Sequence, residues 1–191
     1  MPESPSSLST LNRRSFLKTG ALAIFAAPIL AEAATAKTSS LSNLSERSLS
    51  FFNLHTTESL KTVYWERGNY VPSSLVEINR VLRDHRTDET YEMDPQLLDL
   101  LCDLRLRLDT RESFQIISGY RSPATNAMLN SKSSAVATRS LHMDGKAIDI
   151  RIPGRALSLL RKTALSMKAG GVGYYPSSNF VHVDVGRVRS W

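Results

Sequence analysis

Two short stretches of the sequence carry side chains that bind metal ions in proteins and that strand or helix patterning does not require. The first, residues 140–149, contains His142 and Asp149, and the second, residues 180–184, contains His182. Imidazole nitrogens and a carboxylate oxygen suit zinc, and three protein ligands leave a fourth position open for a catalytic water. The two stretches therefore predict a hydrolytic zinc site made of His142, Asp149 and His182.

Structural roles are the alternative, because each of the four histidines in the chain also fits a loop or a core position. We expect solvated or locally hydrogen-bonded roles for His55, in a hairpin loop, and for His85, at a polar helix end. The histidines of the predicted zinc site differ, because each accompanies an acid that interrupts an apolar strand pattern. These two acids are Asp149 and Asp184.

The surrounding sequence predicts the elements that must position these residues. Apolar periodicity, turn residues and the helix caps Ser73 or Ser74, Asp94 and Ser122 indicate strands and helices in alternating groups. The predicted strands are residues 48–54, 60–66, 114–118, 146–152, 172–175 and 180–185, and the predicted helices are residues 73–84, 94–108, a short helix from 122, and 155–167. This order predicts an α+β fold, with a mostly antiparallel sheet packed against helices.

A third motif completes a recognisable set. Residues 118–122 read Ser-Gly-Tyr-Arg-Ser, a Ser-x-His-x6-Asp pattern runs from Ser140 to Asp149, and a histidine lies in the last strand. Together these motifs resemble the zinc peptidases that include D-Ala-D-Ala carboxypeptidases and the hedgehog signalling domain. Within that group the sequence is most similar to the YcbK-like, or MepK-type, murein endopeptidases, over residues 45–191. The resemblance implies a hedgehog-like or D-Ala-D-Ala-peptidase-like fold.

The resemblance also implies roles for individual residues. The three predicted ligands fall on the zinc-ligand positions of the group, and Arg121 falls on an arginine that orients substrate or stabilises the oxyanion. A structural arginine that bridges a turn is the alternative for Arg121. Ser140 and Tyr174 are expected to contact substrate. Tyr174 and its neighbour Tyr175 also suit packing at the core or rim of a hairpin.

The position of the general base departs from the pattern of the group. Several of these enzymes carry an acid three residues before the last ligand, where this sequence has Asn179. An amide cannot take up the proton, so we assign the base to Asp184. It follows His182 by two residues and therefore shares its face of the strand. The alternative, that Asp184 orients the histidine from behind, is equally open at this point.

The resemblance implies an activity and a substrate. We expect zinc-dependent hydrolysis of the peptide cross-links of bacterial peptidoglycan, by a water that the metal activates and a carbonyl that it polarises. A zinc carboxypeptidase that trims stem peptides is the nearest alternative. A non-catalytic zinc-fold module that binds the cell wall, and a purely structural envelope protein, are alternatives of other classes.

The N-terminal segment is typical of an export signal. Arg13 and Arg14 precede Ser-Phe-Leu-Lys, and an Ala-rich apolar stretch and small residues follow. The paired arginines resemble the twin-arginine consensus, which predicts a periplasmic protein. A general secretion signal and an uncleaved anchor are the alternatives, although the apolar stretch is short for a bilayer span. We predict a signal peptide at residues 1–36, a flexible tether at 37–47 and a zinc peptidase domain at 48–191, without a membrane span after cleavage.

The net charge of the chain narrows the classes of partner that it could bind. The formal net charge of +6 suits nucleic acid, anionic lipid or an anionic cell-wall polymer. Nucleic acid is the weakest of these, because no run of Lys and Arg is interleaved with aromatic residues. Peptidoglycan remains the expected partner, and the oligomeric state stays open.

Cys102 is the single cysteine, which excludes an intramolecular disulfide and suits a core position.

Overall fold

The computed structural model describes residues 41–133 and 136–191. The predicted signal peptide at residues 1–36 lies outside the described residues. A 3-10 helix, η1 (Leu41–Asn43), and the start of strand β1 (Glu46–Asn53) fall within the range 37–47 that was predicted as a tether. Across the described ranges, no helix combines the length and the apolar character needed to cross a membrane.

The described strands form one eight-stranded sheet in the order β3-β2-β1-β4-β5-β7-β6-β8. After β1, the strands are Ser59–Glu66 (β2), Asn69–Tyr70 (β3), Phe114–Ser118 (β4), Ala147–Arg151 (β5), Gly171–Tyr175 (β6), Phe180–Asp184 (β7) and Arg189–Ser190 (β8). The sheet is mixed, which corrects the prediction of a mostly antiparallel one: β1 runs parallel to β4, and β6 parallel to β8. Helices α1 (Pro72–Val81) and α2 (Pro95–Arg107) lie between β1 and β4 in the sequence. A long connection of this kind allows two strands to pair in parallel.

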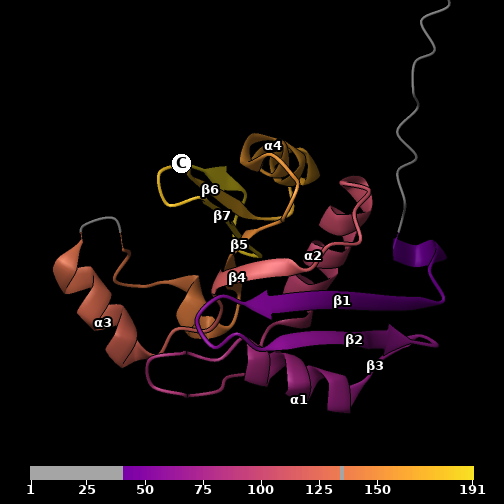
Figure 1. Ribbon diagram of the computed structural model, residues 1–191, viewed down its shortest axis with the longest axis horizontal. Helices are drawn as coiled ribbons and strands as arrows, with labels where there is room; N and C mark the ends of the chain where they lie inside the picture. The colour runs from indigo at the N-terminus through magenta and orange to yellow at the C-terminus, as the bar shows by residue number, and fades with distance from the viewer. Residues whose placement is uncertain (1–40, 134–135) are drawn as a thin grey trace, which may run out of the picture. The chain divides into compact units, whose positions relative to one another are not determined.

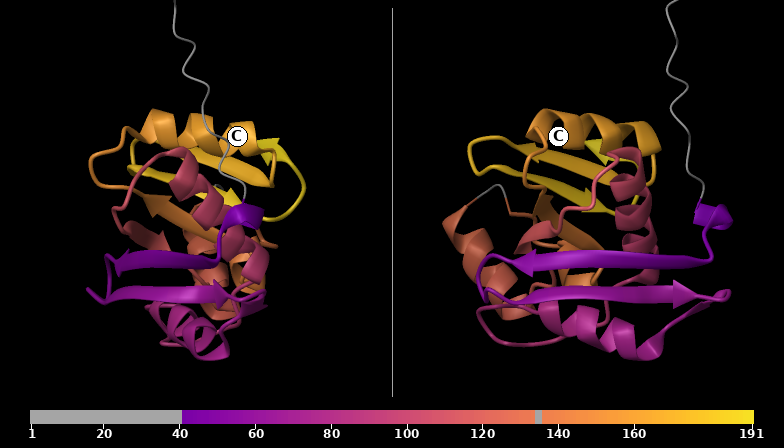
Figure 2. Two further views of the ribbon diagram at one scale, coloured as in Figure 1. Left: turned by 90° about the vertical axis from the view of Figure 1, so that its right-hand side faces the viewer. Right: turned by 45° about the vertical axis from the view of Figure 1, so that its right-hand side comes forward.

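Four α-helices accompany the sheet in the described residues: Pro72–Val81 (α1), Pro95–Arg107 (α2), Pro123–Lys132 (α3) and Leu157–Met167 (α4). Helix α1 packs beside β2, and α4 packs on β6 and β7 (Figures 1 and 2). The side chains of Asp94 and Ser122 accept hydrogen bonds from the first turns of α2 and α3, which confirms two predicted caps. Helix α1 begins before the predicted serine caps, because Pro72 already occupies its first turn.

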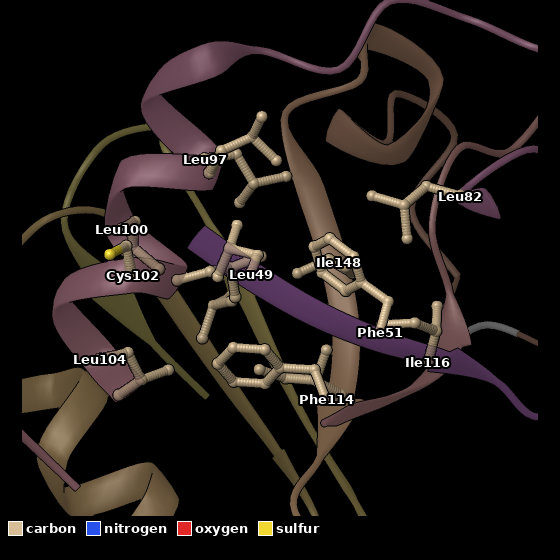
Figure 3. Packing of buried hydrophobic residues seen from close by; sticks show 14 of the residues in the cluster. Leu49, Phe51, Leu82, Leu97, Leu100, Cys102, Leu104, Phe114, Ile116 and Ile148 are labelled. Atoms are coloured by element: carbon tan, nitrogen blue, oxygen red, sulfur yellow. The ribbon is translucent and has the colours of Figure 1, made fainter. Parts of the chain in front are cut away.

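Helix α2 forms one wall of the hydrophobic core. Figure 3 shows its side chains directed at those of β1, β4 and β5. The labelled contributors include Leu97, Leu100 and Leu104 from α2, Leu49 and Phe51 from β1, and Phe114 from β4. Cys102 is fully buried among them, as predicted. Because Ile148 and Val183 also face this core, strand alternation places Asp149 and His182 on the opposite face of the sheet.

His55 and His85, which were predicted to have local roles, stack on one another. Their ring centroids lie 3.7 Å apart with an interplanar angle of 7°. The ring of His55 also lies 3.0 Å from the carbonyl oxygen of Ile117 through Nε2. Partial burial, together with the charges of His55 and Arg86, lowers the pKa of His85 from 6.5 to about 4.

We expect the fold to lose stability as the pH falls from 6.5 to 4. In this window the unfolded chain protonates His85 and the folded chain does not, so the unfolded state binds more protons. Because His85 is partly exposed, screening limits the loss to about 1–2 kcal/mol. Denaturant titrations at several pH values should show this slope in the wild type and a flatter one in His85→Gln. Equal slopes in the wild type and in His85→Gln would contradict the lowered pKa of His85.

Candidate metal centre

The structure brings His142, Asp149 and His182 together. His142 lies in a 3-10 helix, η2 (Leu141–Asp144), Asp149 lies in β5, and His182 lies in β7. Their candidate ligand atoms all lie within 4.8 Å of one another. Asp149 Oδ1 lies 2.9 Å from His182 Nδ1 and 3.3 Å from His142 Nε2. All three side chains are buried, so close packing by neighbouring atoms limits the conformations that they can adopt.

Strand register explains this convergence. Asp149 lies directly opposite His182 in the antiparallel pair of β5 and β7. Residues opposed in this way have their Cβ atoms about 4.5–5.5 Å apart. His142 reaches the pair from η2, which ends at Gly145 in the left-handed conformation, with φ of 65°. The chain therefore turns sharply into β5 and keeps His142 close to Asp149.

The outer ring nitrogens fix the orientation of both imidazoles. His142 Nδ1 lies 2.7 Å from the carbonyl oxygen of Gly119, which can only accept, so Nδ1 carries a proton and Nε2 presents a lone pair. His182 Nε2 lies 3.0 Å from Asp184 Oδ2, and a proton there leaves a lone pair on Nδ1. The two inward nitrogens are 3.2 Å apart. Three electron-pair donors thus face one point, an arrangement that suits a bound cation.

Burial and neighbouring charges shift the pKa values of the ionisable groups of the centre in opposite directions. Burial alone would raise the pKa of Asp149, but the charges and hydrogen bonds of His142 and His182 hold it well below its usual range. Burial would lower the pKa of His182, but hydrogen bonds to Asp149 and Asp184 outweigh it and the pKa is raised. A metal that binds Nδ1 must therefore displace the proton that His182 shares with Asp149. Asp149 is therefore ionised at neutral pH, which is the form that binds metal.

Asp184 lies behind His182 and does not line the pocket in front of the ligands. Its side chain is fully buried. Oδ1 accepts hydrogen bonds from the backbone N–H groups of Gly171 and Gly186, and Oδ2 lies 2.7 Å from Arg189 Nη2. Burial alone would raise the pKa of Asp184, but these bonds and the one to His182 hold it well below its usual range. This position does not fit the predicted role of general base, whereas it does fit the alternative role of orienting His182.

Asn179, where the resemblance led us to look for an acid, lies in the turn between β6 and β7. Its φ of 54° falls in the left-handed region, which Asn tolerates better than most residues. The residue type at this position therefore follows from the turn, and it supplies no base.

The loop after β4 touches the metal centre through its backbone. Gly119 accepts the hydrogen bond from the His142 ring, and Tyr120 N donates to the carbonyl oxygen of Leu82 at 2.7 Å. A Cβ on Gly119 would lie 2.3 Å from that oxygen, so glycine alone fits. The backbone N–H of Arg121 in turn donates to the carbonyl oxygen of His142 at 3.2 Å. The loop therefore holds His142 and Arg121 in one arrangement.

Gly119→Ala is expected to weaken both folding and metal binding. The new methyl group would displace the loop from Leu82, at a cost of about 1–3 kcal/mol in the free energy of unfolding. The Gly119 carbonyl that orients His142 would move with the loop, which should lower metal affinity by about 10–100-fold. Denaturant unfolding and competitive zinc titration measure the two effects. Gly154→Ala is the control for zinc affinity, because an alanine there is strained by a φ of 69° but lies outside the pocket of the metal centre; unchanged zinc affinity in Gly119→Ala would contradict the prediction.

Arg121 presents a poorly satisfied guanidinium beside Asp149. Its Nη2 lies 3.6 Å from Asp149 Oδ2, and its contacts with Ser118 and Asn126 are long, at 3.4 and 3.5 Å. Its Nε is buried without a hydrogen-bond partner. Burial lowers the pKa of Arg121 and the charge of Asp149 opposes that effect, so the group stays cationic. Arg121 can therefore donate to a carbonyl or carboxylate oxygen in the pocket.

The three candidate ligands open onto a pocket of about 370 Å³. Ser140 and Arg121, two of the residues predicted to contact substrate, line this pocket. Tyr174 does not, which corrects its predicted contact with substrate: its ring lies under the Arg161 guanidinium, 4.9 Å from the ring centroid, on the side of α4. Strand alternation directs the next residue, Tyr175, to the pocket instead.

Among the pocket residues that were not predicted, three carry N–H donors: Arg139, Arg189 and Trp191. Arg189 and Trp191 arrive through β8, which has two residues and therefore no hydrophobic period to detect. The one available signal was their spacing, because residues two apart share a face when a strand forms.

Comparison with known proteins agrees with the motifs. Residues 41–191 match the model of the Peptidase_M15_2 family, described as peptidoglycan L,D-endopeptidase MepK. Peptidoglycan L,D-endopeptidase MepK of Escherichia coli K12 is 47% identical over 180 residues, which cover 94% of this chain and 97% of the relative, and the protein of that name from Shigella flexneri gives the same values. Probable peptidoglycan L,D-endopeptidase MepK of Haemophilus influenzae is 39% identical over 185 residues, covering 94% and 95%. No solved structure matches this chain. The family match spans every described residue, and the chain belongs to the Peptidase_M15_2 family of peptidases, as the resemblance in its motifs predicted.

Proposed function

We propose that this protein is a zinc-dependent endopeptidase that hydrolyses peptide cross-links of bacterial peptidoglycan. The observation that carries the proposal is the convergence of three electron-pair donors from His142, Asp149 and His182 at the floor of a pocket. Two imidazoles and a carboxylate with an open side are typical of catalytic zinc. The relatives named peptidoglycan L,D-endopeptidase support the substrate, and their name indicates an L,D bond.

In this proposal each residue of the chain has a distinct task. His142, Asp149 and His182 hold the metal. When bound there, zinc lowers the pKa of a water molecule to about 7 and polarises the scissile carbonyl. Arg121 donates hydrogen bonds to the substrate oxygen that gains negative charge, for which its long contacts leave donors free. Asp184 keeps the His182 ring in the tautomer and orientation that a metal requires.

The charges around the pocket suit this substrate. Arg121, Arg139 and Arg189 line it, and Asp149 is the one carboxylate among the lining residues of the described chain. Once a metal neutralises that carboxylate, the pocket is strongly cationic. Stem peptides of peptidoglycan carry free carboxylates, and a cationic cleft attracts such anions and orients them.

We further propose that the enzyme works in the periplasm. The twin-arginine motif at Arg13 and Arg14 supports export, and a signal peptide at 1–36 followed by a tether at 37–47 would leave residues 48–191 as the catalytic domain. The motif resemblance supports assigning the mixed sheet to the group of folds that includes D-Ala-D-Ala carboxypeptidases and the hedgehog domain.

Digestion of purified, cross-linked peptidoglycan by the mature protein tests the activity. We expect cross-linked dimers to disappear, the loss to stop when a chelator is added, and activity to return with zinc. Release of a terminal residue with the dimers intact would mark a carboxypeptidase instead. Binding to the wall without turnover by metal-loaded protein would mark a binding module and overturn the proposal.

A further inference from the structure

The proposed reaction needs donors for the developing oxyanion, and few groups in the pocket remain available. Once the three ligands hold the metal, the polar side-chain groups left in the lining are three arginines, the hydroxyl groups of Ser140 and Tyr175, and the indole N–H of Trp191. Ser140 lies at the start of η2, and its hydroxyl makes no cap hydrogen bond that would fix it. Tyr175 is different, because its hydroxyl oxygen is anchored by a neighbour.

Tyr175 is held at the end of β6 by two aromatic contacts. Its ring stacks on that of Phe180, its partner in the β6–β7 pair, with centroids 4.5 Å apart and an interplanar angle of 19°. Trp191 Nε1 lies 2.7 Å from the Tyr175 hydroxyl oxygen. An indole N–H can only donate, so the tyrosine oxygen accepts. The described residues offer no acceptor for the proton of that hydroxyl, which is therefore free to donate into the pocket.

The indole ring reaches Tyr175 because β6 leaves space for it. A Cβ on Gly173 would lie 2.8 Å from atoms of the Trp191 ring, so a side chain at this position would displace the indole. The backbone N–H of Trp191 donates to Val172 at 3.2 Å, and the ring lies 5.2 Å from that of His182. Trp191, which contacts both Gly173 and Tyr175, therefore packs beside the predicted metal ligand His182.

Tyr175 and Arg121 line the same pocket. Arg121 lies beside Asp149, and this pocket also holds the three candidate ligands. A substrate carbonyl placed over the metal would therefore have a cationic donor, Arg121, and a neutral hydroxyl donor, Tyr175, in the same pocket.

We propose that Tyr175 is a catalytic residue that donates a hydrogen bond to the oxyanion of the tetrahedral intermediate, and that Trp191 is a positioning residue that directs its hydroxyl proton. The proposal rests on the proposed peptidase function. No proton changes hands in this role: the O–H bond of Tyr175 stays intact, and the hydrogen bond strengthens as negative charge develops. An oxyanion donor of this kind acts on the transition state more than on the bound substrate.

Tyr175→Phe removes the donor and keeps the ring that stacks on Phe180. We expect kcat on a muropeptide dimer joined by an L,D peptide bond to fall about 10²-fold, with KM and bound zinc unchanged within about twofold. Trp191→Phe keeps a ring but loses the indole N–H, and should lower kcat about threefold to tenfold. The double variant should be no slower than Tyr175→Phe, because Trp191 acts through that hydroxyl.

Tyr174→Phe is the matched control, because the same hydroxyl is lost from the neighbouring residue on the other face of β6. It should leave kcat, KM and zinc content unchanged. An active wild type with Tyr175→Phe within twofold of it in kcat would overturn the role of Tyr175 and leave the peptidase function intact. Additive losses in the double variant would overturn the positioning role of Trp191. A wild type that binds zinc but cleaves no dimer would overturn both the proposed function and this inference.

Discussion

Replacing His142 with alanine is expected to abolish zinc binding and peptidase activity together. The side chain is 2% exposed, and its Nε2 faces both Asp149 and His182 at 3.2–3.3 Å. Its removal leaves two ligands on neighbouring strands and an open gap above them. We expect zinc affinity to fall by more than the roughly 10–100-fold that follows loss of an outer hydrogen-bonding partner, and hydrolysis of cross-linked dimers to reach background.

Zinc content after dialysis and dimer hydrolysis, measured on the same preparation, provide the test. His55→Ala is the matched control, because it removes a histidine that stacks on His85 and lies outside the centre. Denaturant unfolding of the metal-free proteins separates loss of the ligand from loss of the fold. A His142→Ala protein that folds, binds zinc with wild-type affinity and cleaves dimers would refute the assigned centre.

The predicted ligand set could be read from sequence because the ligands break a pattern. Asp149 and His182 are polar residues on strands whose other faces, at Ile148 and Val183, are fully apolar, and buried polar residues without a structural reason indicate a site. The same alternation places both on one face of the sheet once β5 and β7 pair. Caps with a following proline placed α2 and α3 correctly for a similar reason, because the signal is local.

The features that sequence did not predict depend on contacts between distant segments. The parallel pairing of β8 with β6 brings Arg189 and Trp191 to the pocket, and a two-residue strand has no period. Parallel pairing of β1 with β4 likewise depends on how the helices return the chain. Tyr174 was assigned to the pocket in place of Tyr175 because the strand register was needed to decide which ring faces the ligands.

For Asp184 too, the sequence predicted the position on the strand but not the contacts of the side chain. Its spacing from His182 correctly indicates a common face, but a spacing does not reveal what surrounds a carboxylate. Both oxygens are occupied by Gly171, Gly186 and Arg189 in the folded chain. A general base needs an oxygen that reaches the reacting water, and Asp184 does not line the pocket in which that water would bind.

Asp184→Asn should therefore weaken zinc binding and folding before it affects chemistry. The amide keeps the shape of the carboxylate, but it leaves Arg189 without its ion pair and replaces an acceptor with a donor. We expect a loss of about 2–4 kcal/mol in the free energy of unfolding, less than for a fully buried pair because Arg189 is partly exposed. Zinc affinity should fall about 10–100-fold, because His182 loses the partner that orients it.

Saturating zinc distinguishes the two roles of Asp184. If Asp184 orients His182, excess metal refills the centre of Asp184→Asn and activity returns to within about tenfold of the wild type. If Asp184 were the base, zinc content would be normal and kcat would stay about 10²–10⁴-fold low at any zinc concentration. Asp88→Asn is the control, because Asp88 is an exposed partner of Arg83 and its loss should change neither zinc affinity nor activity. Since the carboxylate is fully buried behind the His182 ring, we expect recovery with zinc.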